Sequence, residues 1–194
     1  MTIATEKTEL RRRLFDVRRS LTPDSLASFN AALHSRIAEF LTQHGYTSVA
    51  AYMPTRTEPG GEDLVSFLLS VGVSVIIPVA HEDFSMSWHE VTPHTTFRKG
   101  AFGISEPVGS PLPGSPLTQV DVIFVPALAA DAAGYRLGKG GGYYDRALEA
   151  VAHPVTAALV FSHELLPHVP REPHDALTHA IITPEKTLVT DGTF

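Results

Sequence analysis

The sequence predicts a single-domain α/β protein whose open sheet is mostly parallel, carries helices on both faces and has an antiparallel edge. Apolar strand patterns alternate along the chain with segments of helical periodicity, which is the order that a parallel sheet requires. The run Val120–Ala130 is continuously apolar, as expected of a strand covered on both faces. Apolar and polar residues alternate in Phe84–Val91, which indicates an antiparallel strand at the edge.

Four segments have the spacing of helices. In Glu6–Arg19 the apolar residues recur every three or four positions and form one stripe. A second helix is expected to begin at Thr22-Pro23, a hydroxyl N-cap followed by proline, and Gly45 can close it. The other two predicted helices are Glu62–Val71, which ends before Gly72, and Tyr143–Val151.

Short apolar segments, bounded by proline, glycine or polar residues, predict further strands. They are Ser48–Met53, Val73–Ala80, Val155–Phe161 and Ala180–Thr183, with Thr187–Val189 pairing at an edge. Strands and helices in this order are typical of a Rossmann-like sheet. The loop 109–118 is rich in proline and glycine but too short for a domain boundary, so residues 1–194 are expected to form one domain.

Composition narrows the function classes. The net charge is −6 and charged residues make up 19% of the chain, so general nucleic-acid binding is not expected. The chain has no cysteine, which excludes disulfides, cysteine–zinc sites and thiol nucleophiles. A polar N-terminus and the lack of any long apolar run predict a cytoplasmic protein without a membrane partner.

A glycine-rich, basic segment lies between the central strand and the last helix. It runs from Gly134 to Arg146 and reads GYRLGKGGGYYDR. Glycines let the backbone approach an anion and adopt positive φ, and the start of a helix favours negative charge. Arg136 and Lys139 add full charges. The segment matches neither the P-loop nor the dinucleotide-binding pattern. Phosphate binding is the prediction, and a flexible surface turn is the alternative.

The N-terminal helix carries a second group of cations. Lys7, Arg11 and Arg18 fall on one face of Glu6–Arg19, beside its apolar stripe. One interpretation is a solvated basic face. The other is that this edge reaches a polyphosphate, since the rest of the chain is acidic.

Three carboxylates are candidate site residues. Glu58 follows the carboxyl end of the strand Ser48–Met53, where ligands bind in open α/β sheets, although an exposed loop glutamate is the alternative. Asp145 lies in the first turn after the glycine segment and Asp175 in an irregular segment. Both suit Mg²⁺, which takes one or two carboxylates and bridges phosphates. Stabilisation of a helix start and an N-cap are their respective alternatives.

Histidine and serine chemistry lack support in the sequence. His89-Glu90 and His163-Glu164 are each followed by a histidine one residue too late for the H-E-x-x-H zinc pattern. The nucleophile pattern G-x-S-x-G is absent.

Several motifs, in order, resemble those of the 5-formyltetrahydrofolate cyclo-ligase family, also called 5,10-methenyltetrahydrofolate synthetases. The run Arg136–Arg146, placed after Val125–Ala129, closely resembles the family signature. Lys7-x-x-Leu10-Arg11 is similar to the first ATP-contacting motif, and Tyr52-Met53-Pro54 with Glu58 is similar to the folate-contacting segment. Phe102-Gly103-Ile104-x-Glu106-Pro107 and Asp175 match in order and spacing, so the resemblance covers nearly the whole chain.

This resemblance implies an ATP- and Mg²⁺-dependent ring closure of 5-formyltetrahydrofolate to 5,10-methenyltetrahydrofolate, with release of ADP and phosphate. Phosphorylation of the formyl oxygen activates the carbon, and N10 attacks it intramolecularly. The protein supplies positioning and charge stabilisation. The resemblance also implies a protein that acts on small molecules, and we expect a monomer.

The resemblance assigns roles to individual residues. Catalytic roles fall to Lys139, Arg136 and Glu58, and Mg²⁺ ligation to Asp145 and Asp175. The expected ATP contacts are Lys7, Arg11, Arg136, Leu137, Gly138, Lys139, Gly140, Gly141, Gly142, Tyr143 and Tyr144. The expected folate contacts are Met53, Glu58, Lys139, Gly140, Gly141, Gly142 and Tyr143.

Two other functions are compatible with the same pattern. A sensor would bind nucleotide or folate without turnover, and tight ATP binding without phosphate release would distinguish it. A sugar-phosphate isomerase on a similar scaffold would be active without any nucleotide.

Overall fold

The computed structural model describes residues 2–100, 103–149, 151, 154–172 and 175–190. Its helices are α1 (Ile3–Ser20), α2 (Pro23–His44), α3 (Leu64–Ser70) and α4 (Tyr143–Glu149), with 3₁₀ turns η2 (Pro116–Gln119) and η3 (Ser162–Glu164). Its strands are β1 (Ser48–Ala50), β2 (Ser74–Ala80), β3 (Met86–Val91), β4 (Phe97–Lys99), β5 (Ser105–Pro107), β6 (Val122–Pro126), β7 (Ala129–Asp131), β8 (Arg136–Leu137), β9 (Val155–Leu159), β10 (Leu165–Leu166), β11 (Ala180–Ile182) and β12 (Thr187–Val189).

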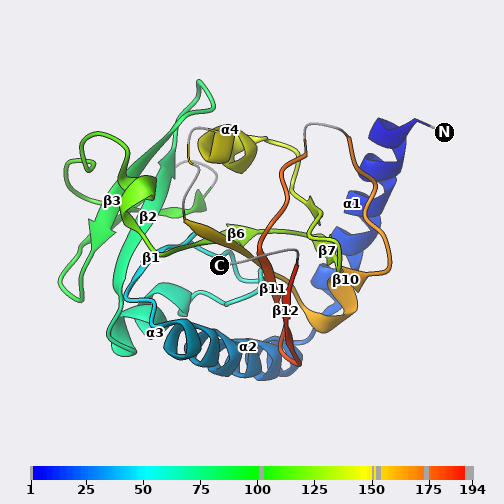
Figure 1. Cartoon of the computed structure of the whole chain (residues 1–194), viewed down its shortest axis with the longest axis horizontal. Helices are drawn as coiled ribbons and strands as arrows, with labels where there is room; N and C mark the ends of the chain where they lie inside the picture. The colour runs from blue at the N-terminus through cyan, green and yellow to red at the C-terminus, as the bar shows by residue number, and fades with distance from the viewer. Residues whose placement is uncertain (1, 101–102, 150, 152–153, 173–174, 191–194) are drawn as a thin grey trace.

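The main sheet has seven strands in the order β12-β11-β9-β6-β1-β2-β3 (Figure 1). The five inner strands are parallel to one another, with Val49 beside Val75 on one side and Val122 on the other. Both edges are antiparallel, because β3 pairs with β2 and β12 with β11. The predicted mostly parallel α/β sheet with an antiparallel edge is therefore confirmed.

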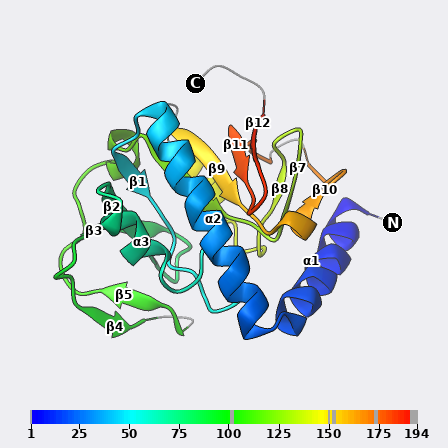
Figure 2. The ribbon, with the colours of Figure 1, turned by 90° about the horizontal axis from the view of Figure 1, so that it is seen from below.

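Helices cover both faces of this sheet. Helices α2 and α3 lie below it and α4 above it in Figure 1, and Figure 2 shows α2 running across the lower face. Leu33 and Phe40 of α2 and Leu68 of α3 pack on one buried cluster of strand side chains. Ala147 and Leu148 of α4 pack on the cluster of the other face.

The predicted limits of α2 are confirmed by its caps. The Thr22 hydroxyl accepts a hydrogen bond from the Ser25 amide, and Pro23 is the first helical residue. Gly45 closes the helix at φ 67°, where a side chain would be strained.

The prediction of one strand over Val120–Ala130 is wrong. Strand β6 ends at Pro126, and the chain enters a separate three-stranded sheet, β10-β7-β8, in which β7 and β8 form a hairpin. The Leu128 amide now bonds the Leu137 carbonyl. The run stays apolar because Leu128 and Ala129 enter a third buried cluster, beneath Leu14 of α1. The residues of Val120–Ala130 therefore stay apolar past Pro126, although the chain there leaves the main sheet and pairs with different strands.

Because of the β7–β8 hairpin, the glycine segment does not directly follow the central strand β6. It was expected to follow a buried parallel strand, but Arg136 and Leu137 belong to β8, so the loop proper is Gly138–Gly142. The helix predicted after it is present as α4, a short element of seven residues.

A small two-stranded hairpin, β4–β5, projects from the edge of the molecule beyond β3 (Figure 2). Arg98 pairs there with Glu106 in the register of the strands. Phe102, quoted in the family motif, lies outside the described residues. Among the helices that the structure describes, none has the length and apolarity needed to cross a membrane.

Candidate active site

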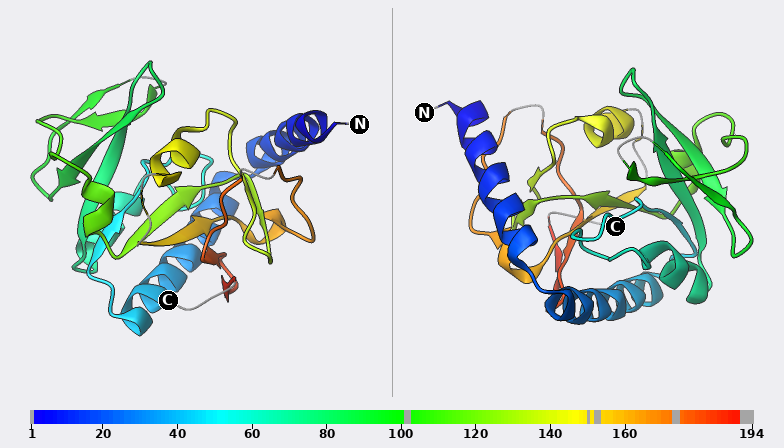
Figure 3. Two further views of the ribbon diagram at one scale, coloured as in Figure 1. Left: turned by 45° about the horizontal axis from the view of Figure 1, so that its top comes forward. Right: turned by 180° about the vertical axis from the view of Figure 1, so that it is seen from behind.

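A cavity of about 710 Å³ opens at the carboxyl ends of β1, β2 and β6. Its lining comes from α1, the segments after β1 and β6, the end of β2, Met86 of β3, the β4–β5 hairpin, the glycine loop with the flanking ends of β8 and α4, and the residues Glu172, Asp175 and Ala176. Figure 3 shows α1 and the β3–β5 region on opposite sides of α4. The volume is in the range of small-molecule sites, and the position is typical of ligand binding in α/β sheets.

The sheet has its switch point between β1 and β6. From β1 the chain moves outward through β2, whereas from β6 it moves the other way through β9 and β11. Connections therefore leave the two central strands in opposite directions, which opens a crevice beyond their carboxyl ends. Tyr52 and Met53 follow β1, Ala127 follows β6, and all three line the cavity.

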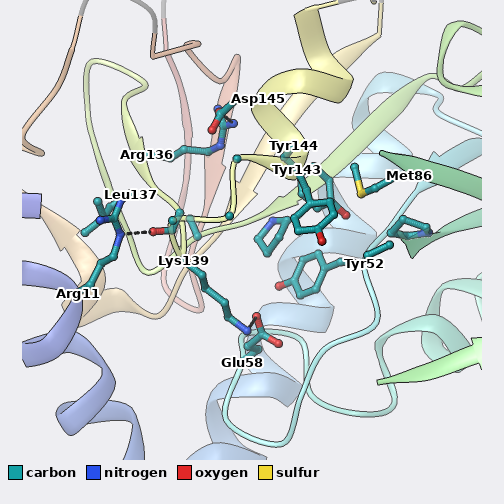
Figure 4. A pocket seen from close by; sticks show the side chains of 18 of the residues that line it. Arg11, Tyr52, Glu58, Met86, Arg136, Leu137, Lys139, Tyr143, Tyr144 and Asp145 are labelled. Atoms are coloured by element: carbon teal, nitrogen blue, oxygen red, sulfur yellow. Dashed lines mark hydrogen bonds and ion pairs between the residues drawn. The ribbon is translucent and has the colours of Figure 1, made fainter. Parts of the chain in front are cut away.

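The glycine loop is held in place by arginines on both sides. Arg11 of α1 donates from Nε to the Gly138 carbonyl at 2.9 Å (Figure 4), and Arg146 of α4 donates from Nη2 to the Gly141 carbonyl at 2.6 Å. Gly140 has φ 100°, and a Cβ on it would lie 3.5 Å from the Arg11 guanidinium. That distance is an ordinary contact, so the positive φ and not a lack of space favours glycine at this position. Two of the loop's carbonyls therefore accept hydrogen bonds from arginine side chains of α1 and α4.

Lys7 lies on the helical face next to Arg11 and is nearly buried. Its Nζ is 2.6 Å from Asp175 and 2.8 Å from Glu172. Burial alone would lower the pKa of Lys7, but the two carboxylates outweigh it and hold the pKa above its ordinary value. The ammonium is therefore charged at neutral pH and joins α1 to Glu172 and Asp175.

Arg136 contacts Asp145 and the main chain next to Asp175. Its guanidinium pairs with Asp145 and donates from Nη1 to the carbonyl of Ala176 at 3.0 Å. The Asp175 carboxylate itself pairs with Lys7, so the two candidate metal ligands have different cationic partners in the same cavity. In the described part of the chain, no group of three or more His, Asp or Glu side chains is placed to hold a metal.

Glu58 forms the opposite pole of the cavity. It is 5% exposed, so the alternative of an ordinary exposed glutamate is wrong. Lys139 Nζ lies 2.8 Å from its Oε1 (Figure 4). The amide and hydroxyl of Thr55 both donate to its Oε2 at 2.8 Å. Burial alone would raise the pKa of Glu58, but Lys139 and Thr55 lower it below its ordinary value. The carboxylate is therefore ionised and accepts hydrogen bonds.

The loop that carries Glu58 is fixed to α2. The Gly60 amide donates to the Asn30 side chain at 3.0 Å, and His34 Nε2 lies 2.7 Å from the Gly60 carbonyl. Tyr52 donates to the Pro59 carbonyl at 2.6 Å. Gly60 has φ 97° and a Cβ on Gly61 would meet Asn30 at 2.7 Å, which explains the glycine pair.

The structure brings every predicted site residue to this cavity: Lys7, Arg11, Met53, Glu58, Arg136, Leu137, Gly138, Lys139, Gly140, Gly141, Gly142, Tyr143, Tyr144, Asp145 and Asp175 all line it. Arg18 differs from the other two cations of its helix face, because it is buried against Glu164 and does not reach the cavity.

Sequence reasoning missed part of the lining. Pro78–Ala80 form the carboxyl end of the predicted strand Val73–Ala80, so the switch-point rule applied to that strand would have found them. Ile104 and Glu106, which were quoted only as part of the family motif, reach the cavity from the β4–β5 hairpin. Glu172 had no signal beyond its place three residues before Asp175.

The fold and the charged cavity at its switch point define a doubly wound α/β enzyme. The sequence model of the 5-formyltetrahydrofolate cyclo-ligase family matches residues 3–184. The chain therefore belongs to the 5-formyltetrahydrofolate cyclo-ligase family, whose members are ligases.

Relatives and solved structures agree with this assignment. The 5-formyltetrahydrofolate cyclo-ligase of Mycolicibacterium smegmatis is 39% identical over 190 residues, covering 94% of this chain and 96% of the relative. The Escherichia coli enzyme of the same name is 29% identical over 177 residues, covering 87% and 95%. The 5,10-methenyltetrahydrofolate synthetase of Aquifex aeolicus has a similar structure, with a TM-score of 0.80 at 30% identity, covering 97% of this chain and 95% of that one.

Proposed function

We propose that this chain closes the ring of 5-formyltetrahydrofolate to 5,10-methenyltetrahydrofolate in a reaction that consumes ATP and requires Mg²⁺. The observation that carries the proposal is the division of one cavity into two poles. Lys7, Arg11 and Arg136 line the side next to the glycine loop, whereas Glu58 and Met53 line the side next to β1. The first pole suits a polyphosphate, and the second suits a neutral heterocycle with N–H donors.

The chemistry requires both poles at once. The oxygen of the formyl group on N5 attacks the γ-phosphorus of ATP, and ADP leaves. N10 then adds to the activated formyl carbon. The ring closes to the methenyl product when N10 loses its proton and phosphate departs from the carbon. This chain offers cations, backbone donors and carboxylates for that task, in agreement with catalysis by positioning and charge stabilisation. Lys139 extends from the glycine loop to Glu58 and so joins the two poles.

The polyphosphate would be held by Lys7, Arg11, Arg136 and Lys139, with main-chain donors from Leu137, Gly138, Gly140–Gly142, Tyr143 and Tyr144. Glu58 would accept hydrogen bonds from pterin N–H groups, with Met53, Tyr143 and the glycine loop around the formyl end. Lys139, Arg136 and Glu58 contact the reacting groups in this arrangement and are the proposed catalytic residues.

The donor set also fits Mg²⁺, which takes carboxylate oxygens and bridges phosphates. Asp145 and Asp175 would hold it, since both line the cavity. The metal would neutralise developing charge on the phosphates. Arg136 and Lys7, which pair with these carboxylates in the structure, would turn to the phosphate oxygens.

The direct test mixes purified protein with 5-formyltetrahydrofolate, ATP and Mg²⁺ and follows the near-ultraviolet absorbance of the methenyl product. We expect a rise that requires ATP. A flat trace from folded protein that still binds ATP would contradict the proposal and favour a sensor. A rise without any nucleotide would contradict the ATP requirement.

Replacing Asp175 by asparagine should raise the Mg²⁺ concentration needed for half-maximal turnover by at least tenfold, the effect typical of a lost interaction at a metal site. Asparagine keeps an acceptor for the Glu172 amide, which bonds Asp175 at 2.7 Å, so the segment stays folded. Asp24→Asn, an exposed residue at the start of α2, is the control. An unchanged Mg²⁺ titration for Asp175→Asn would exclude it as a ligand.

A further inference from the structure

Two buried polar side chains of α2, Asn30 and His34, bind the loop that follows Glu58. The Asn30 side-chain oxygen accepts a hydrogen bond from the Gly60 amide at 3.0 Å, and His34 Nε2 lies 2.7 Å from the Gly60 carbonyl. Because a carbonyl oxygen can only accept, His34 Nε2 carries the hydrogen of this bond. The two side chains are 8% and 9% exposed, and neither is among the described residues that line the cavity. They lie four positions apart and therefore share one face of the helix.

The loop is bound by side chains at two consecutive residues. Pro59 has no amide hydrogen, and its carbonyl accepts a hydrogen bond from the buried Tyr52 hydroxyl at 2.6 Å. Because α2 binds both main-chain groups of Gly60, every main-chain polar group of Pro59 and Gly60 has a buried side chain as its partner. A loop that only connects two elements can leave such groups to water. The observed contacts instead hold this segment at a defined place beside the cavity.

These contacts set the position of Glu58, because the residues before it form a closed turn. The Glu58 amide donates to the Thr55 carbonyl at 2.9 Å, and the Thr55 amide donates to the Glu58 carboxylate at 2.8 Å. Hydrogen bonds within the turn hold its shape but do not place it in the molecule. Outside the turn, Glu58 meets the partly exposed Lys139, and two residues further on Gly60 makes its buried contacts to α2. The buried contacts are therefore the firmer support.

Helix α2 is a rigid base for this support. It spans 22 residues, and Leu33 and Ile37 on either side of His34 are completely buried in the core. The His34 ring also stacks on Phe67 of α3, with ring centroids 4.2 Å apart and ring planes 4° from parallel. A side chain that orients a substrate has to be held within about 0.5 Å of the productive geometry, which requires support of this kind.

We propose that Asn30 and His34 are positioning residues, which set the affinity for the folate by holding Glu58 through Gly60. This inference rests on the proposed function, in which the Glu58 carboxylate accepts hydrogen bonds from the pterin. Neither side chain touches substrate in this arrangement. The cations of α1 that are proposed to bind ATP contact other segments of the chain. A change at α2 should therefore weaken folate binding and leave ATP binding intact.

The decisive experiment compares two substitutions of His34. His34→Phe keeps a ring that can stack on Phe67 but removes the donor to the Gly60 carbonyl. His34→Gln loses the ring but keeps an N–H at the place of Nε2. In His34→Phe the KM for 5-formyltetrahydrofolate should rise on the order of tenfold, the value of one hydrogen bond, while the KM for ATP stays unchanged. In His34→Gln the KM for the folate should remain close to that of the wild type.

Asn30→Ala tests the other hydrogen bond to the loop. It leaves the buried Gly60 amide without its partner, so we expect a lower melting temperature and the same selective rise in the KM for the folate. Thr183→Ala is the matched control, because Thr183 is 1% exposed and its hydroxyl binds the amide and the carbonyl of Lys186 in the β11–β12 turn. Neither of these two residues lines the cavity. The melting temperature of Thr183→Ala should also fall, with both KM values unchanged.

Folate binding is also measured without turnover. The melting-temperature increase that 5-formyltetrahydrofolate alone produces should shrink in His34→Phe and Asn30→Ala and persist in Thr183→Ala. The kinetic assays are run well below the melting temperature of every variant, so that unfolding does not contribute to the constants.

An unchanged KM for the folate in His34→Phe and Asn30→Ala would overturn the inference, as would an equal rise in the KM for ATP or the same selective rise in Thr183→Ala. A KM of His34→Gln as high as that of His34→Phe would show that the ring, and not the donor, matters, and would also contradict it. A wild type that neither turns over nor is stabilised by 5-formyltetrahydrofolate would overturn the proposed function itself, and the inference with it.

Discussion

Lys139→Ala should reduce turnover at least a hundredfold while the protein stays folded. Lys139 is the cation of the glycine loop that lies at the junction of the two poles, 2.8 Å from Glu58. Removing one preorganised group that stabilises developing charge costs on the order of 3 kcal/mol, which is more than a factor of one hundred in rate. Because the side chain is 44% exposed, its pairing with Glu58 adds only about 1 kcal/mol to stability.

Turnover measured at saturating ATP and folate, with circular dichroism on the same samples, provides the check. Lys186→Ala removes an exposed lysine of the β11–β12 turn and should retain full turnover. Near-wild-type turnover of Lys139→Ala would remove this residue from the proposed mechanism. A comparable loss in Lys186→Ala would point to a general effect of charge.

The same variant should change how stability depends on pH. In the wild type the pKa of Glu58 lies below its ordinary value of 4.5, so its ionisation stabilises the fold above that pH. Lys139→Ala removes the two Lys139 contributions that lower the pKa of Glu58, while burial, which raises it, remains, so the pKa of Glu58 should be higher in the variant than in the wild type. The stability difference between the two proteins should therefore be greatest near neutral pH and shrink as the pH falls below 4.5. A pH-independent difference would contradict this coupling.

The sequence was sufficient for the order and type of the main-sheet elements. Periodicity and end signals, such as Thr22 and Gly45 around α2, are local, and the structure uses them as predicted. The alternation in Phe84–Val91 correctly indicated the edge strand β3, because one face of an edge strand meets the core and the other meets water.

The break between β6 and β7 could not be predicted in the same way. Both strands are buried, one in the main sheet and one under α1, so the residues on either side of Ala127 have the same apolar character. An apolar pattern indicates that a strand is buried and does not indicate which strand it pairs with. The pairing of β7 with β8 could therefore not be predicted from this pattern.

The sequence motifs predicted which residues line the site, but they did not predict which of these residues form ion pairs with one another. Lys7 meets Asp175 and Lys139 meets Glu58 across long stretches of sequence. The helix face Lys7, Arg11 and Arg18 shows the limit most clearly. These three cations of one helix face have different surroundings, because α1 borders the cavity at Lys7 and Arg11 but buries Arg18 against Glu164 and Ala127 at its end.

Arg18→Met should be the most destabilising single substitution that we predict. Arg18 and Glu164 are 2% and 0% exposed and form two hydrogen bonds, at 2.6 and 2.9 Å. Arg18 also donates to the Ala127 carbonyl at 2.6 Å. Removing the arginine leaves a buried carboxylate without its cation, which typically costs 3–5 kcal/mol, roughly 6–20 °C in melting temperature for a chain of this length.

Two further variants separate charge burial from packing. Arg19→Met removes the neighbouring arginine, whose side chain is 73% exposed, and should change stability by less than about 0.5 kcal/mol. In Arg18→Met/Glu164→Leu no charge is left buried, so the double variant should be more stable than Arg18→Met, because a buried pair replaced by apolar side chains costs little. A double variant no more stable than the single one would show that packing, and not the unpaired carboxylate, causes the loss.

The double variant also connects this buried pair to the active site. Arg18 ties the end of α1 to Ala127, which lines the cavity, while Lys7 and Arg11 reach the cavity from the start of the same helix. If the pair sets the placement of α1, the refolded double variant should show a raised KM for ATP, whose proposed contacts lie on α1, and little change in the KM for the folate. Equal changes in both constants would instead indicate a general loosening of the fold.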